Sequence, residues 1–241
     1  MISRVGVAAR RALLLLPFAG AATSAQTLGG LTQRGSGAGF NIIDNTTQSS
    51  SINISGINNR VIGTSAQGQS VVVRLNGLSH TWVGDLIIDL RFQSATPLSS
   101  VISWTLMARP AIFATGSSFG FNDNLLGSYS FGEGDAGSGS FLGDFNDFWA
   151  FNNPAGGANL PSGDYFAFDE LNGYQSPGDK FVGVDPNGTW SLHIGDVAGP
   201  DAGALQSWDL AFHTVPEPAS LAVTAMGVMA LAAAARRRRS V

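Results

Sequence analysis

Aspartate residues in this chain recur where the sequence predicts turns and strand ends. Carboxylate and backbone carbonyl oxygens are the ligands that calcium prefers. The candidate calcium ligands are Asp44, Asp85, Asp185, Asp196 and Asp201. An aspartate in a turn also commonly accepts a hydrogen bond from its own backbone. The sequence therefore predicts a calcium-stabilised domain, with turn capping as the alternative role of each carboxylate.

Few side chains in this sequence could act as a nucleophile or as part of a catalytic acid–base pair. The chain contains no cysteine and three histidines, which are His80, His193 and His213. His193 and His213 fall on the polar side of alternating segments, where an exposed or hydrogen-bonded histidine is expected. A pair of carboxyl groups in a glycosidase-like cleft stays open as an alternative. We expect no catalytic residues and no enzyme activity.

Composition and charge narrow the class of protein. Between Gln26 and Val215, 16 residues are Asp or Glu and six are Lys or Arg. Because binding to a phosphate backbone depends on basic patches, we expect no nucleic-acid partner. Hydrophobic residues make up 44% of the chain, which is enough to bury a core. The 31 glycines and ten prolines favour short strands joined by tight turns.

The first 25 residues have the layout of a secretory signal peptide. Residues 1–11 are basic, residues 12–22 are apolar, and small residues follow up to Ala25. This order predicts export by the secretion machinery and cleavage between Ala25 and Gln26. The protein is therefore expected in the cell envelope, at the surface or outside the cell.

The chain ends with a second targeting segment. The motif Val215-Pro216-Glu217-Pro218 precedes an apolar stretch at 219–235, and four arginines follow at 236–239. The stretch is at the short end of what a membrane-spanning helix needs, and the arginines favour the cytoplasmic side. Residues 215–241 resemble the PEP-CTERM sorting signal.

That resemblance implies transient membrane insertion and recognition by an exosortase in a Gram-negative-type envelope. It also implies processing near the Pro-Glu-Pro motif, followed by release or attachment at the surface, often alongside exopolysaccharide. An ordinary C-terminal membrane anchor is the alternative interpretation of the same segment.

Between the two targeting segments, the sequence predicts a linker and one folded domain. Residues 26–39 are rich in Gly, Ser, Thr and Gln and predict a flexible lead-in to a domain at 40–213. Apolar and polar side chains then alternate with the period of half-buried strands over residues 71–76, 86–92, 190–194 and 208–213. A turn at 199–203 separates the last two segments and predicts that they pair antiparallel.

The middle of the chain, from residue 114 to residue 179, shows a weaker pattern, and long loops are expected there. Phe148 and Trp149 lie in this region and are the candidate binding surface, because an aromatic side chain in a loop can be exposed. Trp82, Trp190 and Trp208 lie on or next to alternating segments and are expected in the core.

Three segments together resemble the P domain, also called Homo B. They are residues 80–90 (HTWVGDLIIDL), 185–192 (DPNGTWSL) and 203–210 (GALQSWDL). Residues 41–45 (NIIDN) and 127–131 (GSYSF) resemble its opening and middle segments more loosely. The resemblance implies an all-β, jelly-roll, galactose-binding-like β-sandwich. P domains accompany subtilisin-like proprotein convertases and secreted bacterial proteases, and some are calcium-stabilised.

These inferences point to an exported, non-catalytic surface or extracellular-matrix protein. It is expected to be sorted by an exosortase, stabilised by calcium, and able to bind exopolysaccharide or an envelope protein. The alternative is an accessory domain of, or a protein diverged from, a secreted subtilisin-like serine endopeptidase system.

Overall fold

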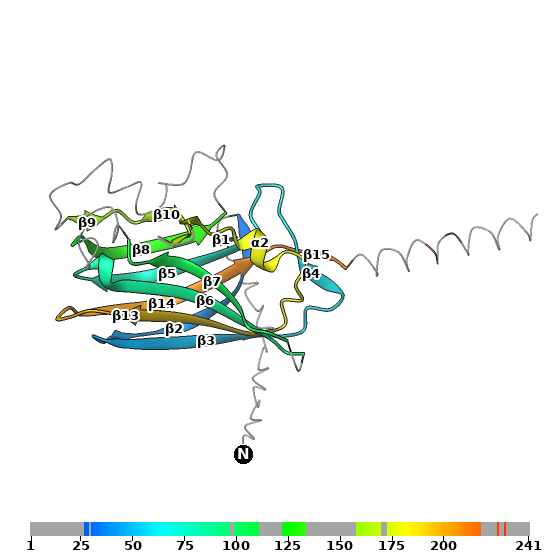
Figure 1. Cartoon of the computed structure of the whole chain (residues 1–241). Helices are drawn as coiled ribbons and strands as arrows, with labels where there is room; N and C mark the ends of the chain where they lie inside the picture. The colour runs from blue at the N-terminus through cyan, green and yellow to red at the C-terminus, as the bar shows by residue number, and fades with distance from the viewer. Residues whose placement is uncertain are drawn as a thin grey trace, which may run out of the picture.

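The computed structural model describes residues 27–28, 30–96, 99–110, 122–133, 158–169 and 173–217, together with residues 226 and 229. In these residues the chain forms two β-sheets packed face to face, with a small two-stranded ribbon and a short helix at one end (Figure 1). The predicted all-β sandwich is therefore confirmed.

The first sheet has seven strands among the described residues, in the order β1-β2-β14-β5-β8-β10, and β9 also pairs with β8. Its strands are β1 (Thr27–Leu28), β2 (Leu31–Ile42), β5 (Val71–His80), β8 (Asn124–Gly132), β9 (Asn159–Leu160), β10 (Gly163–Phe166) and β14 (Gly203–Phe212). The strands β9 and β10 run parallel to β8, and the other pairs in this sheet are antiparallel.

The second sheet has six strands in the described part of the chain, in the order β12-β11-β7-β6-β13-β3. Its strands are β3 (Thr46–Ile54), β6 (Leu86–Ser94), β7 (Ile102–Ala108), β11 (Phe168–Asp169), β12 (Gly173–Tyr174) and β13 (Gly188–Asp196). A 3₁₀ turn, η1 (Val83–Asp85), leads into β6, and the five-residue helix α2 (Pro177–Phe181) precedes β13.

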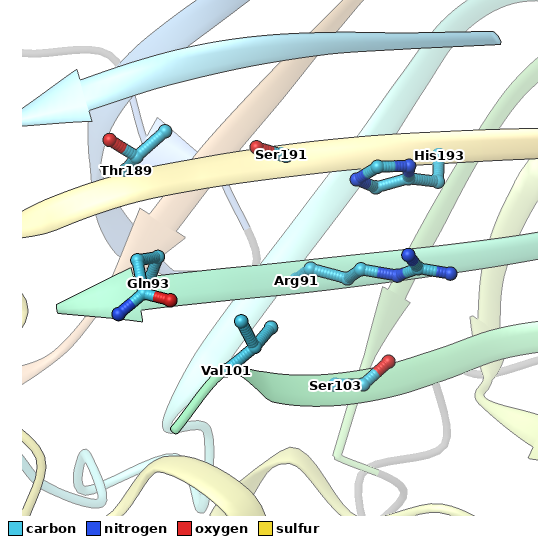
Figure 2. A pocket seen from close by; sticks show the side chains of 7 residues that line it. All are labelled: Arg91, Gln93, Val101, Ser103, Thr189, Ser191 and His193. Carbon is cyan, nitrogen blue, oxygen red and sulfur yellow. The ribbon is translucent and has the colours of Figure 1, made fainter. Parts of the chain in front are cut away.

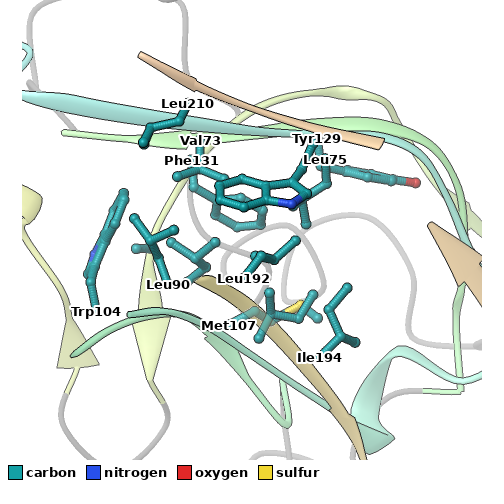
Figure 3. Packing of buried hydrophobic residues seen from close by; sticks show 14 of the residues in the cluster. Val73, Leu75, Leu90, Trp104, Met107, Tyr129, Phe131, Leu192, Ile194 and Leu210 are labelled. Atoms are coloured by element: carbon teal, nitrogen blue, oxygen red, sulfur yellow. The ribbon is translucent and has the colours of Figure 1, made fainter. Parts of the chain in front are cut away.

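The core lies between the two sheets and is built from the apolar phase of each strand. In Figure 3, side chains such as Val73, Leu75 and Leu210 of the first sheet face Leu90 and Leu192 of the second. The apolar phase predicted for β5, β6, β13 and β14 is confirmed by burial, but Val72 and Ala211 of the opposite phase are also buried, in a small cluster with Leu31. Three tryptophans, Trp104, Trp190 and Trp208, are fully buried, whereas Trp82 is half-buried.

The predicted pairing of the last two strands is wrong. β13 pairs with β3 and β6, and β14 pairs with β2 and β5, so the turn between them crosses from one sheet to the other. β5 and β6, which are also consecutive in the chain, likewise belong to different sheets. In each case both strands direct their apolar side chains into one core, and they therefore face each other across it instead of lying side by side.

The flexible lead-in predicted at residues 26–39 is also wrong, because most of it belongs to the twelve-residue strand β2. Its glycines allow close packing. A Cβ atom on Gly37 would collide with the indole ring of Trp208, which crosses over the strand and donates a hydrogen bond to Ser50 Oγ at 2.6 Å. Glycine in a strand marks such close approaches, and composition alone does not separate this use from flexibility.

The middle region holds more strand than was expected. β8 is a nine-residue strand of the first sheet, and its side chains Tyr129 and Phe131 are fully buried. Long loops were expected across residues 114–179. Among the described residues, no helix is long and apolar enough to cross a membrane. The apolar stretch predicted at 219–235 falls outside the described residues, apart from Met226 and Met229.

Candidate functional site

Four of the five predicted calcium ligands lie at one end of the sandwich, here called the acidic end. Asp44 follows β2, Asp85 precedes β6, Asp196 ends β13, and Asp201 lies just before β14. The strand register explains why these four aspartates lie close together. Gly203 of β14 pairs with His80 on β5, and Asp196 of β13 pairs with Leu86 on β6.

Asp185 is separated from this group. It precedes the start of β13, and Asp196 ends that nine-residue strand, which spans roughly 26 Å at the usual rise of a strand. Its Oδ1 accepts hydrogen bonds from the backbone N–H of Asn187 at 3.0 Å and from Asn187 Nδ2 at 2.6 Å. Asp185 therefore has the turn-capping role.

A buried histidine–aspartate pair lies at the centre of the acidic end. His80 Nε2 lies 3.1 Å from Asp196 Oδ2, and both side chains are 0% exposed. The other ring nitrogen, Nδ1, lies 2.9 Å from the backbone oxygen of Trp82 and 3.2 Å from its nitrogen. Both nitrogens are thus engaged by the protein itself, and the ring is closed to solvent.

Asp85 differs from its neighbours because its carboxylate makes no described hydrogen bond. The side chain is buried, at 2% exposure, and its Oδ1 has no hydrogen-bond partner. Burial, followed by the charges of Asp196 and Asp201, raises the pKa of Asp85 to about 6, although Arg109 and His80 act in the opposite direction. An unpartnered buried carboxyl is costly, and a nearby positive charge would relieve that cost.

The remaining carboxylates of the acidic end bond to nearby protein groups. Asp44 Oδ1 accepts from the backbone N–H of Asp201 at 3.1 Å, Asp201 Oδ1 accepts from Thr81 Oγ1 at 2.6 Å, and Asp196 Oδ1 accepts from the N–H of Ala198 at 3.2 Å. Within the described residues, no three histidine or acidic side chains converge as a metal site. A cation here would rely on Asp85 with backbone oxygens or water rather than on a full carboxylate cage.

A second candidate site is an open groove on the outer face of the second sheet (Figure 2). Its volume is about 590 Å³. Arg91 and Gln93 of β6 line it with Ser103 of β7 and Val101 just before that strand, and the β13 residues Thr189, Ser191 and His193 complete the lining. His193 was expected on the polar face of a strand, but no groove was predicted there.

The charges of the groove are few and partly paired. Arg91 Nη2 donates to Asp89 Oδ2 at 3.2 Å, and the Arg91 side chain is 44% exposed. Asp89 also accepts a hydrogen bond from Thr105 Oγ1 at 2.9 Å. Burial, followed by the charge of Arg91, lowers the pKa of His193, while Asp89 opposes this. The lowered pKa favours the neutral imidazole, which offers one donor and one acceptor.

The predicted sorting motif begins in the two-stranded ribbon at one end of the sandwich. Val215 and Pro216 belong to β15 (Thr214–Pro216), which pairs antiparallel with β4 (Arg60–Ile62). The Glu217 N–H donates to the backbone oxygen of Asn59 at 3.1 Å. A Cβ atom on Gly63 would lie 2.7 Å from Val215, so the motif is packed closely against the domain.

Several predicted residues lie outside the described part of the chain: Ala25, Gln26, Phe148, Trp149 and Pro218. The same is true of Ser118 in the segment 116–120 (GSSFG), which has the Gly-x-Ser-x-Gly spacing of a nucleophile elbow and was missed in the sequence analysis. That spacing indicates a nucleophile only at a strand-to-helix turn of an α/β sheet.

Comparisons with known proteins find similarity to solved structures but not to known sequences. No protein-family model and no curated protein sequence matches the chain. The crystal structure of a complex between an Aeromonas sobria serine protease and a chaperone is similar over 80% of this chain, with 17% identity and a TM-score of 0.35. The likeness spans 28% of the length of that chain.

Proposed function

We propose that this chain is an exported, non-catalytic β-sandwich of the jelly-roll, galactose-binding-like type, related to the P domain and presented at the cell surface or in the extracellular matrix. The three P-domain-like segments support this proposal. They occupy the β5–β6 connection, β13 and β14, which pack around one core.

The observation that carries the non-catalytic role is the closed His80–Asp196 pair. A histidine that serves as a general base must reach a nucleophile or a substrate proton. Here Nε2 faces Asp196, Nδ1 faces the backbone of Trp82, and neither the His80 nor the Asp196 side chain is exposed. The pair joins the end of β5 to the end of β13 and stabilises the sandwich.

This role can be tested with the full chain purified in mild detergent. We expect no cleavage of unfolded casein above the background of a His80→Gln variant. Proteolysis that disappears in His80→Gln, while near-ultraviolet circular dichroism shows that the variant is folded, would overturn the non-catalytic role.

Sorting by an exosortase is the second part of the proposal. Its support is the order of the C-terminal sequence, in which Val215-Pro216-Glu217-Pro218 leads into the apolar stretch 219–235 and the arginines 236–239. In a host with an exosortase, the mature protein should lack this tail by intact-mass spectrometry. In a matched host without the enzyme, the chain should keep it and stay with the membrane fraction. An identical mass and location in both hosts would contradict this part.

A stabilising calcium ion at the acidic end is the third part. It is supported by the buried, unpartnered Oδ1 of Asp85 and by the repulsion from Asp196 and Asp201. A bound ion stabilises the native state by mass action. Thermal unfolding of the full chain should therefore move to higher temperature in millimolar calcium than in chelator. Equal midpoints would remove calcium from the proposal without affecting the other parts.

The alternative role is as an accessory domain of, or a protein diverged from, a secreted subtilisin-like serine endopeptidase system, and the P-domain-like segments favour it. Such a role predicts that co-expression lengthens the lifetime of a subtilisin-like protease from the same secretome. An unchanged protease half-life with and without the chain would remove this alternative.

A further inference from the structure

The groove on the second sheet presents hydrogen-bonding side chains in rows that follow the strand register. Thr189 lies between Asn53 on β3 and Gln93 on β6, and Ser191 lies between Ser51 and Arg91. Thr189 Oγ1 donates to Asn53 Oδ1 at 2.8 Å, and the Ser51 and Ser191 hydroxyls are 2.8 Å apart. The hydroxyls are thus oriented by their neighbours.

The spacing of these groups suits a repeating polar chain. Side chains on one face of a sheet repeat at about 4.8 Å across the strands and about 6.6 Å along them. Serine, threonine and glutamine side chains each combine a donor with an acceptor, which matches the mixed character of sugar hydroxyls. An open groove with these groups accommodates an extended polymer better than an enclosed apolar pocket would.

The charge of the groove differs from that of the rest of the domain. None of its seven lining residues is acidic, and Arg91 carries its cationic charge. A guanidinium has five N–H donors, and the described hydrogen bond to Asp89 uses one of them. Arg91 can therefore still bind a carboxylate, which an arginine holds with two parallel hydrogen bonds.

A protein partner fits this surface less well. Protein interfaces have a buried centre rich in aromatic residues and methionine. The lining contains neither, and its one large apolar side chain is Val101, at 55% exposure.

We infer that the groove binds an acidic polysaccharide, with Arg91 bonding the carboxylate of a uronic-acid unit and Thr189, Ser191 and Gln93 bonding its hydroxyls. This inference rests on the proposed role as a surface binding module and specifies its ligand class. Sorting and calcium do not enter the binding step, so failure of binding and failure of the sorting experiment are distinguishable.

The experiment measures binding of the full chain, in mild detergent, to polygalacturonate and to its methyl ester, which has the same backbone without free carboxylates. We expect Arg91→Gln to weaken polygalacturonate binding by about tenfold or more, because a charged hydrogen bond is lost. The matched control is Arg74→Gln on β5 of the other sheet, where Arg74 Nε donates to Ser130 Oγ at 3.0 Å. This control should leave the affinity within about twofold.

A second variant blocks the groove without removing charge. Ser103 is exposed on β7, and Ser103→Tyr should abolish binding while the unfolding temperature stays close to that of the unmodified chain. Three results would overturn the inference: no binding of folded protein to polygalacturonate, equal binding of the acid and the ester, or binding that survives both Arg91→Gln and Ser103→Tyr. Retention of an envelope protein that Ser103→Tyr abolishes, with no polysaccharide bound, would assign the groove to a protein instead.

Discussion

The acidic end and the groove are both polar, but they hold their polar groups in opposite ways. At the acidic end, His80, Asp85 and Asp196 are buried, and the carboxylates repel one another. In the groove, hydroxyl and amide groups are accessible, and Arg91 and Asp89 form a partly exposed ion pair. Buried charges act strongly on stability, whereas exposed neutral groups are available to a ligand. The difference predicts that substitutions at the acidic end change stability and that substitutions in the groove change ligand binding.

An aspartate-to-alanine substitution should give the largest difference in stability between the two regions. Asp196→Ala leaves the buried His80 ring without its partner and should lower the free energy of unfolding by about 2–4 kcal/mol. Asp89→Ala removes a partly exposed ion pair and should cost less than about 1 kcal/mol. Urea unfolding monitored by tryptophan fluorescence measures both, and comparable losses would break the comparison.

The effect of Asp85→Asn on stability should differ in sign between chelator and calcium. In chelator at pH 8 the substitution removes a buried ionised carboxyl and should stabilise the domain by about 2 kcal/mol. The folded pKa of about 6 lies above the ordinary value of 3.8. The unsubstituted chain should therefore regain this stability as pH falls through 6, and the two proteins should converge near pH 4. In calcium the variant should gain no further stability, whereas the unsubstituted chain should. Parallel melting curves in all conditions would contradict both assignments.

Groove substitutions should affect binding and leave stability nearly unchanged. Arg91→Gln and Ser103→Tyr change exposed side chains and should shift the free energy of unfolding by no more than about 0.5 kcal/mol. Chemical denaturation of each variant beside Arg74→Gln gives the measurement. A loss comparable to that of Asp196→Ala would show that the groove contributes to folding and would remove the contrast.

The smallest expected effect is on the titration of His193. Its folded pKa is lowered, so its contribution to stability is complete above the ordinary histidine pKa and is lost as pH falls toward the folded value. Arg91→Gln removes one cause of the lowering and should raise the pKa, while burial keeps part of the shift. Nuclear magnetic resonance of the imidazole Cε1–H follows this directly, and an unchanged pKa would show that Arg91 does not face the ring.

Local alternation in the sequence predicts which side chains of β5, β6, β13 and β14 are buried, and it does so because each strand has one apolar face. It does not predict strand neighbours. Ser191 and Arg91 are 100 positions apart in the sequence, and only their register across β13 and β6 places them in one groove. The close-packing role of Gly37 was hidden for the same reason, since it depends on Trp208 crossing from a distant strand.

The acidic end was predictable in part. Turn positions identified Asp44, Asp85, Asp196 and Asp201 as a class, but local sequence could not separate them from Asp185, which has the same turn chemistry at the other end of β13. Nor could it distinguish Asp85 from the carboxylates that bond to nearby groups, because burial without a partner is a property of the packed structure.

The pairing of β15 with β4 also leaves only a short connection between the folded domain and the C-terminal apolar stretch. The chain is held through Pro216 by strand pairing and at Glu217 by a hydrogen bond to Asn59, and the apolar stretch begins at residue 219. One residue, with a reach of roughly 3.5 Å, lies between them. If the tail inserts in lipid, this short connection keeps the β4–β15 end of the sandwich close to the bilayer. The acidic end lies away from β15, at the start of β14. If the tail does insert in a membrane, cutting it would release the sandwich from that position.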